Sequence, residues 1–105
     1  MGLDVSLKLK NKNTGETREL SDYGGSNFNF IKDYANHNNL YGKDIEITAE
    51  LGESFILRGL KILRENGFET SELGEDYGLM GFIKNLHLAN YYERFGYTLF
   101  VNADW

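Results

Sequence analysis

The chain has 105 residues, and 41% of them are hydrophobic, which is enough for one domain with a single core. It has no cysteine, which excludes disulfides and thiolate metal sites and leads us to expect a cytoplasmic protein. A net charge of −5 argues against direct nucleic-acid binding, and no apolar run approaches the roughly 20 residues that span a bilayer. We therefore expect a single domain over residues 1–105 that contacts neither nucleic acid nor membrane.

The N-terminal residues predict a β-hairpin. Apolar and polar residues alternate from Leu3 to Leu9, as in a half-buried strand. Turn-forming residues then lead to Gly15, and Glu16 to Leu20 predicts the returning strand. Residues 21–26 predict a loop containing the flexible Gly24-Gly25 pair.

Two helices are predicted in the middle of the chain. The first spans Asn27 to Asn36, with Ser26 or Asn27 as its cap. Asp44 to Thr48 predicts either a short strand or an extended approach to the second helix. The second helix starts at Thr48, whose hydroxyl can cap it, and ends at Asn66-Gly67. Its inward side chains recur at helical spacing and are Leu51, Phe55, Ile56, Leu60, Ile62 and Leu63.

Two glycines lie on one face of this second helix. Gly52 and Gly59 are two turns apart, and each costs roughly 1 kcal/mol against alanine in a helix interior. They therefore predict a close-packed neighbour. A third helix is expected from Asp76 to about Phe95, followed by a strand over Tyr97 to Asn102. The expected fold is α+β, with a small antiparallel sheet of the N-terminal hairpin and the C-terminal strand, packed on one face by about three helices.

Catalytic and metal-binding patterns do not stand out in the sequence. His37 and His87 lack metal-ligand spacing, and there is neither a strained serine elbow nor a phosphate-binding glycine loop. We therefore expect no cofactor and no metal, and binding is favoured over catalysis.

Two groups of residues remain as candidate binding sites. Residues 65–83 contain five acids and no base, which indicates either a solvated loop or a surface for a basic partner; the acids are Glu65, Glu69, Glu72, Glu75 and Asp76. The second group is a possible ligand-binding loop, since asparagine amides can read a base edge or a sugar and tyrosine can stack. Its members are Tyr23, Asn27, Asn29, Tyr34, Asn36 and His37.

Two short stretches resemble known proteins. Ala89 to Phe100 (ANYYERFGYTLF) is similar to the late helix-to-strand piece of the GCN5-related N-acetyltransferases, which implies a coenzyme A cleft between splayed strands. The pyrophosphate-binding loop of that family corresponds here to Ala49–Ser54, where Glu50 and Glu53 would oppose phosphates. The opening MGLDVSL resembles a group of small phage and bacterial proteins, which implies a phage or mobile-element context.

Three functions follow from these patterns. The first is a stoichiometric inhibitor, such as an anti-CRISPR protein, that applies the acidic stretch to the basic surface of a host nucleic-acid-binding complex. The second is a small-molecule binder, for instance a sponge for a nucleotide signal, that uses the loop of tyrosines and asparagines. The third is a degenerate acetyltransferase.

Overall fold

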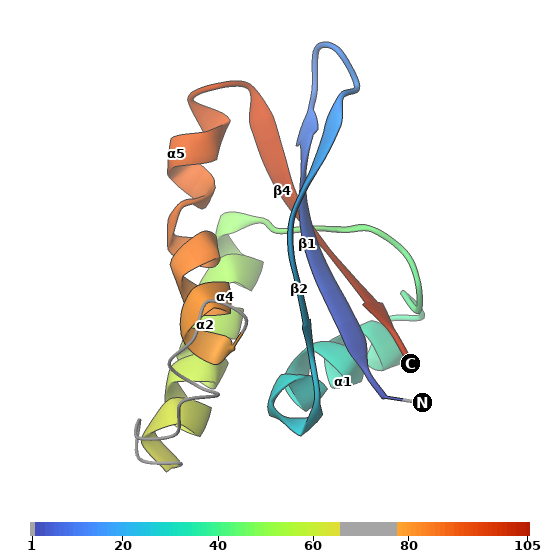
Figure 1. Ribbon diagram of the computed structural model, residues 1–105, viewed down its shortest axis with the longest axis vertical. Coiled ribbons are helices and arrows are strands. Elements are labelled where there is room, and N and C mark those ends of the chain that lie inside the picture. The colour runs from blue at the N-terminus through green and yellow to red at the C-terminus, as the bar shows by residue number, and fades with distance from the viewer. Residues whose placement is uncertain (1, 66–77) are drawn as a thin grey trace.

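The computed structural model describes residues 2–65 and 78–105, which contain one antiparallel sheet with helices packed on one of its faces (Figure 1). The strands lie in the order β2-β1-β4-β3, with bounds β1 (Asp4–Asn11), β2 (Thr17–Gly24), β3 (Ile45–Glu46) and β4 (Tyr97–Asp104). The predicted α+β fold, with the hairpin and the C-terminal strand in one sheet, is confirmed. The sheet is antiparallel throughout. A hairpin turn joins β1 to β2, whereas helices lie between β2 and β3 and between β3 and β4.

The described helices are one 3₁₀ turn and four α-helices. They are η1 (Ser26–Phe28), α1 (Asn29–His37), α2 (Ala49–Glu65), α4 (Leu79–His87) and α5 (Ala89–Glu93). Figure 1 shows α2, α4 and α5 together beside the sheet, with α1 near the end of the sheet at which both termini lie. In the part of the chain that the structure describes, no helix is long and apolar enough to cross a membrane.

The second strand is longer than the sequence predicted. It continues beyond Leu20 to Gly24, because residues 21–24 pair with the start of β1 instead of forming a loop. The register shifts between Leu7 and Lys8, so Leu20 is the extra residue of a β-bulge. This shift places Tyr23 opposite Val5, with its side chain in the core.

The start of α2 and the role of its two glycines are as the sequence predicted. The Thr48 hydroxyl accepts a hydrogen bond from the backbone N–H of Leu51 at 3.2 Å. A Cβ on Gly59 would lie 3.0 Å from Ile83 Cδ1, and a Cβ on Gly52 would lie 3.2 Å from Ile47 Cγ2. The predicted close-packed neighbours are therefore confirmed as Ile83 of α4 and Ile47 before the helix.

One residue of α2 is placed differently from the prediction. The buried line of the helix runs through Gly52, Phe55, Gly59 and Leu63, and Leu60 is 36% exposed. One residue turns a helix by about 100°, so Leu60 points away from the α4 contact that Gly59 makes. Phe55 and Leu63, and not Leu60, are the buried apolar residues on this part of the helix.

The other two helices also differ in detail from the prediction. The first begins as the 3₁₀ turn η1, and no side-chain hydrogen bond caps either η1 or α1, so neither Ser26 nor Asn27 has the predicted capping role. The third helix is divided at Leu88, where ψ is −1° and the N–H is shared between the carbonyls of Lys84 and Asn85, as in a 3₁₀-type turn. Its predicted start at Asp76 lies outside the described residues.

A cluster of aromatic rings joins the sheet to the helices. Phe82 of α4 meets Tyr23 and Phe28 edge-to-face, with ring centroids 5.3 Å apart in both pairs. Phe30 of α1 meets Phe55 of α2 in the same way at 5.8 Å. Such contacts add about 0.5–1.5 kcal/mol each beyond the area that they bury. This cluster holds α1, α2 and α4 in fixed positions above the sheet.

Candidate functional site: an acid-rimmed groove beside the start of α2

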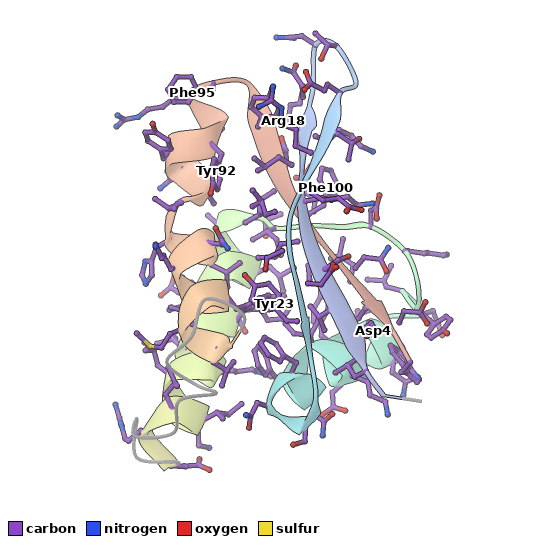
Figure 2. The ribbon with its side chains drawn as sticks, viewed as in Figure 1. Asp4, Arg18, Tyr23, Tyr92, Phe95 and Phe100 are labelled. Atoms are coloured by element: carbon purple, nitrogen blue, oxygen red, sulfur yellow. The ribbon has the colours of Figure 1, made fainter. Side chains whose placement is uncertain are left out.

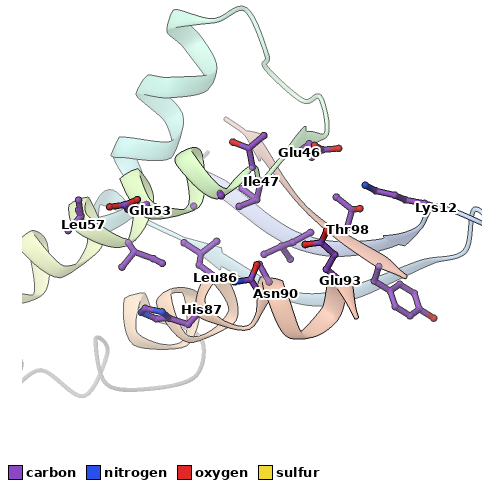
Figure 3. Close-up of a pocket in the computed structure, with 17 residues that line it drawn as sticks. Lys12, Glu46, Ile47, Glu53, Leu57, Leu86, His87, Asn90, Glu93 and Thr98 are labelled. Atoms are coloured by element: carbon purple, nitrogen blue, oxygen red, sulfur yellow. The ribbon is translucent and has the colours of Figure 1, made fainter. Parts of the chain in front are cut away.

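A groove of about 480 Å³ opens between the first half of α2, the α4–α5 junction and the first residues of β4 (Figure 3). Its floor is apolar and consists of Ile47, Ile56, Leu86 and Leu99. Three of these side chains are at most 8% exposed, so the floor is continuous with the core. Leu57 of α2 also lines the groove and is 61% exposed, which extends the apolar surface out to the rim.

The groove follows from how the helices pack. Gly59 and Ile83 bring α2 and α4 into contact about one turn beyond Ile56, where the groove begins. The break at Leu88 then starts α5, which packs against β4 and supplies Asn90 and Glu93 to the opposite wall. Two stretches of the chain, residues 46–57 and 86–99, thus form a single concave surface together with Lys12.

The rim of the groove carries more negative than positive charge. Glu46 of β3, Glu53 of α2 and Glu93 of α5 are exposed carboxylates, whereas Lys12 contributes one ammonium group. Figure 3 shows Glu53 with Leu57 on α2, and Glu46, Glu93 and Lys12 on the side of the strands and α5. Charges on both walls favour a cationic ligand and disfavour phosphate.

A partly buried hydrogen-bonded network positions the α4–α5 wall. The Asn85 side-chain amide donates to the Tyr23 hydroxyl at 2.9 Å, and the Tyr92 hydroxyl donates to Asn85 Oδ1 at 3.3 Å. Burial raises the pKa of Tyr92, and the nearby Tyr23 and Tyr91 raise it further. The network therefore connects β2, α4 and α5 through one amide, and nothing in the spacing of the sequence singled out Asn85.

Comparison with protein-family models, with curated proteins and with solved structures finds no match. Any function must therefore be inferred from the surface of this chain.

The predicted ligand-binding loop is divided between the core and the surface. Tyr23 is 4% exposed and packs against Phe28 and Phe82, so its ring has no free face on which a ligand could stack (Figure 2). Tyr34 is half-buried and meets the Phe55 ring edge-on at 5.5 Å. The remaining members lie along η1 and α1, and none of the six lines the groove; those members are Asn27, Asn29, Asn36 and His37.

The predicted acidic surface lies mostly beyond what the structure describes. Glu65 is the last residue of α2 and is exposed. Glu69, Glu72, Glu75 and Asp76 lie outside the described residues. The two histidines are both exposed, His37 at the end of α1 and His87 at the end of α4, where it lines the groove. Glu46 and Glu93 were not singled out from the sequence, and Glu53 was considered there only as an obstacle to phosphate binding. Nothing in the spacing of the three acids indicates that folding brings them together.

A second acidic area lies on the face of the sheet that the helices leave uncovered. Asp4 and Asp104 are directly opposite each other on β1 and β4, and Asp22 is opposite Ser6 on β2. Figure 2 shows Asp4 and Phe100 on the side of the sheet away from α2 and α4. Among the described residues, no group of three or more histidine or acidic side chains is arranged to hold a metal ion.

The chain end is attached to this face by a tyrosine. The Tyr41 hydroxyl donates a hydrogen bond to Asp104 at 2.5 Å and contacts the Trp105 carbonyl oxygen at 2.9 Å. The hydrogen bond to Asp104, followed by burial and the Asp104 charge, raises the pKa of Tyr41 above its ordinary value. The Tyr41 ring also meets Trp105 edge-on at 4.6 Å, so residues 40–44 are held against the end of β4.

Proposed function

We propose that this chain is a stoichiometric inhibitor that binds a basic surface of a host nucleic-acid-handling complex, in the way an anti-CRISPR protein does. The observation that carries the proposal is the groove, which combines an apolar floor with three carboxylates on its rim. A partner surface that binds nucleic acid must itself be basic, so a protein of net charge −5 competes with phosphates for it. The resemblance of the opening MGLDVSL to small phage and bacterial proteins supports a context in which such a target exists.

The physical gain from acidic charge is chiefly in association rate. Complementary charge steers two proteins together and raises their association rate at low salt, whereas exposed charges are screened beyond about 10 Å at 0.1 M salt. The apolar floor then supplies contact that salt does not weaken. At high salt, the association rate should therefore fall, while part of the affinity is retained.

The acidic residues on the uncovered face of the sheet also favour a basic partner. Like charges placed directly opposite on neighbouring strands are destabilising, and Asp4 faces Asp104 in this way. A basic partner relieves that repulsion. The acidic segment of residues 65–76 adds further negative charge to the chain.

A small-molecule binder is the second candidate, and the volume of the groove favours it. Ligand sites commonly occupy about 300–1,000 Å³, and the groove falls in that range. A nucleotide would bring its phosphates to Glu46, Glu53 and Glu93, so an uncharged or cationic ligand suits the groove better than a nucleotide signal. The acetyltransferase alternative meets the same obstacle, because Glu53 lines the groove within the segment Ala49–Ser54.

The proposal is tested by capturing the partner with tagged protein from a bacterial host lysate at low and high salt, and identifying it by mass spectrometry. The purified partner should lose its nucleic-acid binding when one equivalent of this protein is added. Two charge-removal variants should slow the association and flatten its salt dependence; they are Glu46→Gln/Glu53→Gln/Glu93→Gln and Glu69→Gln/Glu72→Gln/Glu75→Gln.

A matched control separates local charge from net charge. Neutralising Glu19, Asp33 and Glu50, which are exposed and do not line the groove, also removes three negative charges. This control should retain most of the wild-type association rate. The proposal is wrong if neither test variant changes the rate at low salt, or if the captured partner still binds nucleic acid at one equivalent.

A further inference from the structure

The groove also indicates the chemistry of the segment that would occupy it. We propose that it binds a cationic amphipathic segment of the partner protein, with an apolar side chain on the floor and lysine or arginine side chains at the rim. This inference rests on the proposed function and specifies the partner's contact.

The apolar part of the groove is larger than a single side chain needs. The floor is continued by Leu57, and Leu60 follows one turn later on α2 with 36% of its surface exposed. Exposed leucines at i and i+3 form an apolar strip along one side of a helix. A segment with two or more apolar residues at helical spacing matches this surface, as in the recognition of an amphipathic helix by a groove.

The charges at the rim select the polar part of the segment. Glu53 stands on α2, and Glu46 and Glu93 stand across the groove from it. The opposing positive charges are Lys12 and the N-terminal end of α2, which is equivalent to roughly half a charge. Three carboxylates outweigh these two, so cationic side chains on both sides of the apolar residues are favoured.

The same balance weighs against a phosphate-bearing small molecule. A nucleotide would need cations where the rim has carboxylates, and its base would need an aromatic ring on which to stack. Tyr97 and His87 carry the rings that line the groove, and the Arg18 guanidinium already lies 5.6 Å from the Tyr97 ring centroid. A cationic protein segment therefore fits the groove better than a nucleotide.

The test uses synthetic peptides and the full chain. A fluorescein-labelled peptide of leucine and lysine at helical spacing, about four turns long, is titrated and followed by fluorescence anisotropy. It should bind, and added salt should weaken the binding. A leucine–glutamate peptide with the same spacing and a scrambled leucine–lysine peptide should each bind at least about tenfold more weakly.

A matched pair of variants locates the binding. Asn90→Trp puts a large ring at the exposed wall of the groove, whereas Asn36→Trp makes the same change at an exposed position on α1, outside the groove. Asn90→Trp should lower the affinity for the leucine–lysine peptide by at least about tenfold, and Asn36→Trp should leave that affinity within about twofold of the wild-type value. Circular dichroism melting of both variants checks that each remains folded.

The outcomes separate this inference from the proposed function. If Asn90→Trp is folded and binds the peptide as the wild type does, or if the scrambled or acidic peptide binds equally well, the groove is not a site for a cationic amphipathic segment. If ATP displaces the peptide, the small-molecule alternative is favoured instead. If the captured partner binds Asn90→Trp as it binds the wild type, but associates more slowly with Glu69→Gln/Glu72→Gln/Glu75→Gln, the inference about the groove fails while the proposed function stands.

Discussion

Truncation of two leucines on α2 tests the core assignment directly. Leu60 and Leu63 have the same side chain, lie on the same helix and are three residues apart. Leu63 is 0% exposed and Leu60 is 36% exposed. The sequence alone placed both on the inward face, whereas the structure predicts that Leu63→Ala is much more harmful than Leu60→Ala.

The expected magnitudes follow from burial. Replacing a fully buried leucine by alanine costs about 2–5 kcal/mol, because transfer free energy is lost and a cavity remains. Full burial of a leucine is worth about 1.5–3 kcal/mol, and Leu60 has about two thirds of its surface covered. Water fills the space that Leu60→Ala opens, so no closed cavity adds to its cost. We expect a loss of about 3 kcal/mol at Leu63 and about 1 kcal/mol at Leu60.

The assay is urea denaturation followed by circular dichroism, with thermal melting as a second measure. One kcal/mol lowers Tm by about 4–8 °C in a domain of this size, so the two variants should differ by at least about 8 °C. Leu57→Ala, at a position that is 61% exposed, serves as the control and should stay within about 0.5 kcal/mol of the wild type. Equal losses at Leu60 and Leu63, or a larger loss at Leu60, would show that the buried face of α2 has been assigned incorrectly.

Three further predictions test other parts of the structure. Gly59→Ala should lower the free energy of unfolding by about 1 kcal/mol in urea denaturation, because crowding against Ile83 exceeds the gain in helix propensity. The loss should be smaller in an Ile83→Val background, and an equal loss in both backgrounds would exclude that contact as the cause. Tyr41 should titrate above its ordinary pKa of 10.0, and the stability that it contributes should be present below that pH and lost as the pH rises through the raised pKa. Ultraviolet titration of the wild type against Tyr41→Phe measures this pKa. Asp104→Asn should lower it, and an unchanged pKa in Asp104→Asn would contradict the hydrogen bond. Coenzyme A should not bind, because Glu50 and Glu53 stand at the start of α2 where phosphates would approach, and calorimetry that found micromolar affinity would refute this.

Local patterns in the sequence were enough to predict most of the fold. The alternation from Leu3 to Leu9 depends only on the two-residue period of a strand, and those leucines and Val5 are buried as predicted. Thr48 caps α2 because a hydroxyl satisfies free N–H groups within one turn. Gly59 indicated a close neighbour because glycine is unfavourable in a helix unless something needs the space.

Long-range contacts decided what those patterns could not. Residues 21–24 read locally as a loop, and they form a strand because β1 offers free backbone hydrogen-bonding groups to pair with them. No glycine or proline at Leu88 indicates the break between α4 and α5. Leu60 is exposed because α4 packs against Gly59 beside it.

The candidate site depends on the same long-range contacts. Glu46, Glu53 and Glu93 come from three separate elements, and their charges form one rim only after α2, α4 and α5 have packed over the sheet. The sequence determined how much acid the chain carries, and tertiary packing decided where these carboxylates lie, because their mutual distances are set by contacts between other residues.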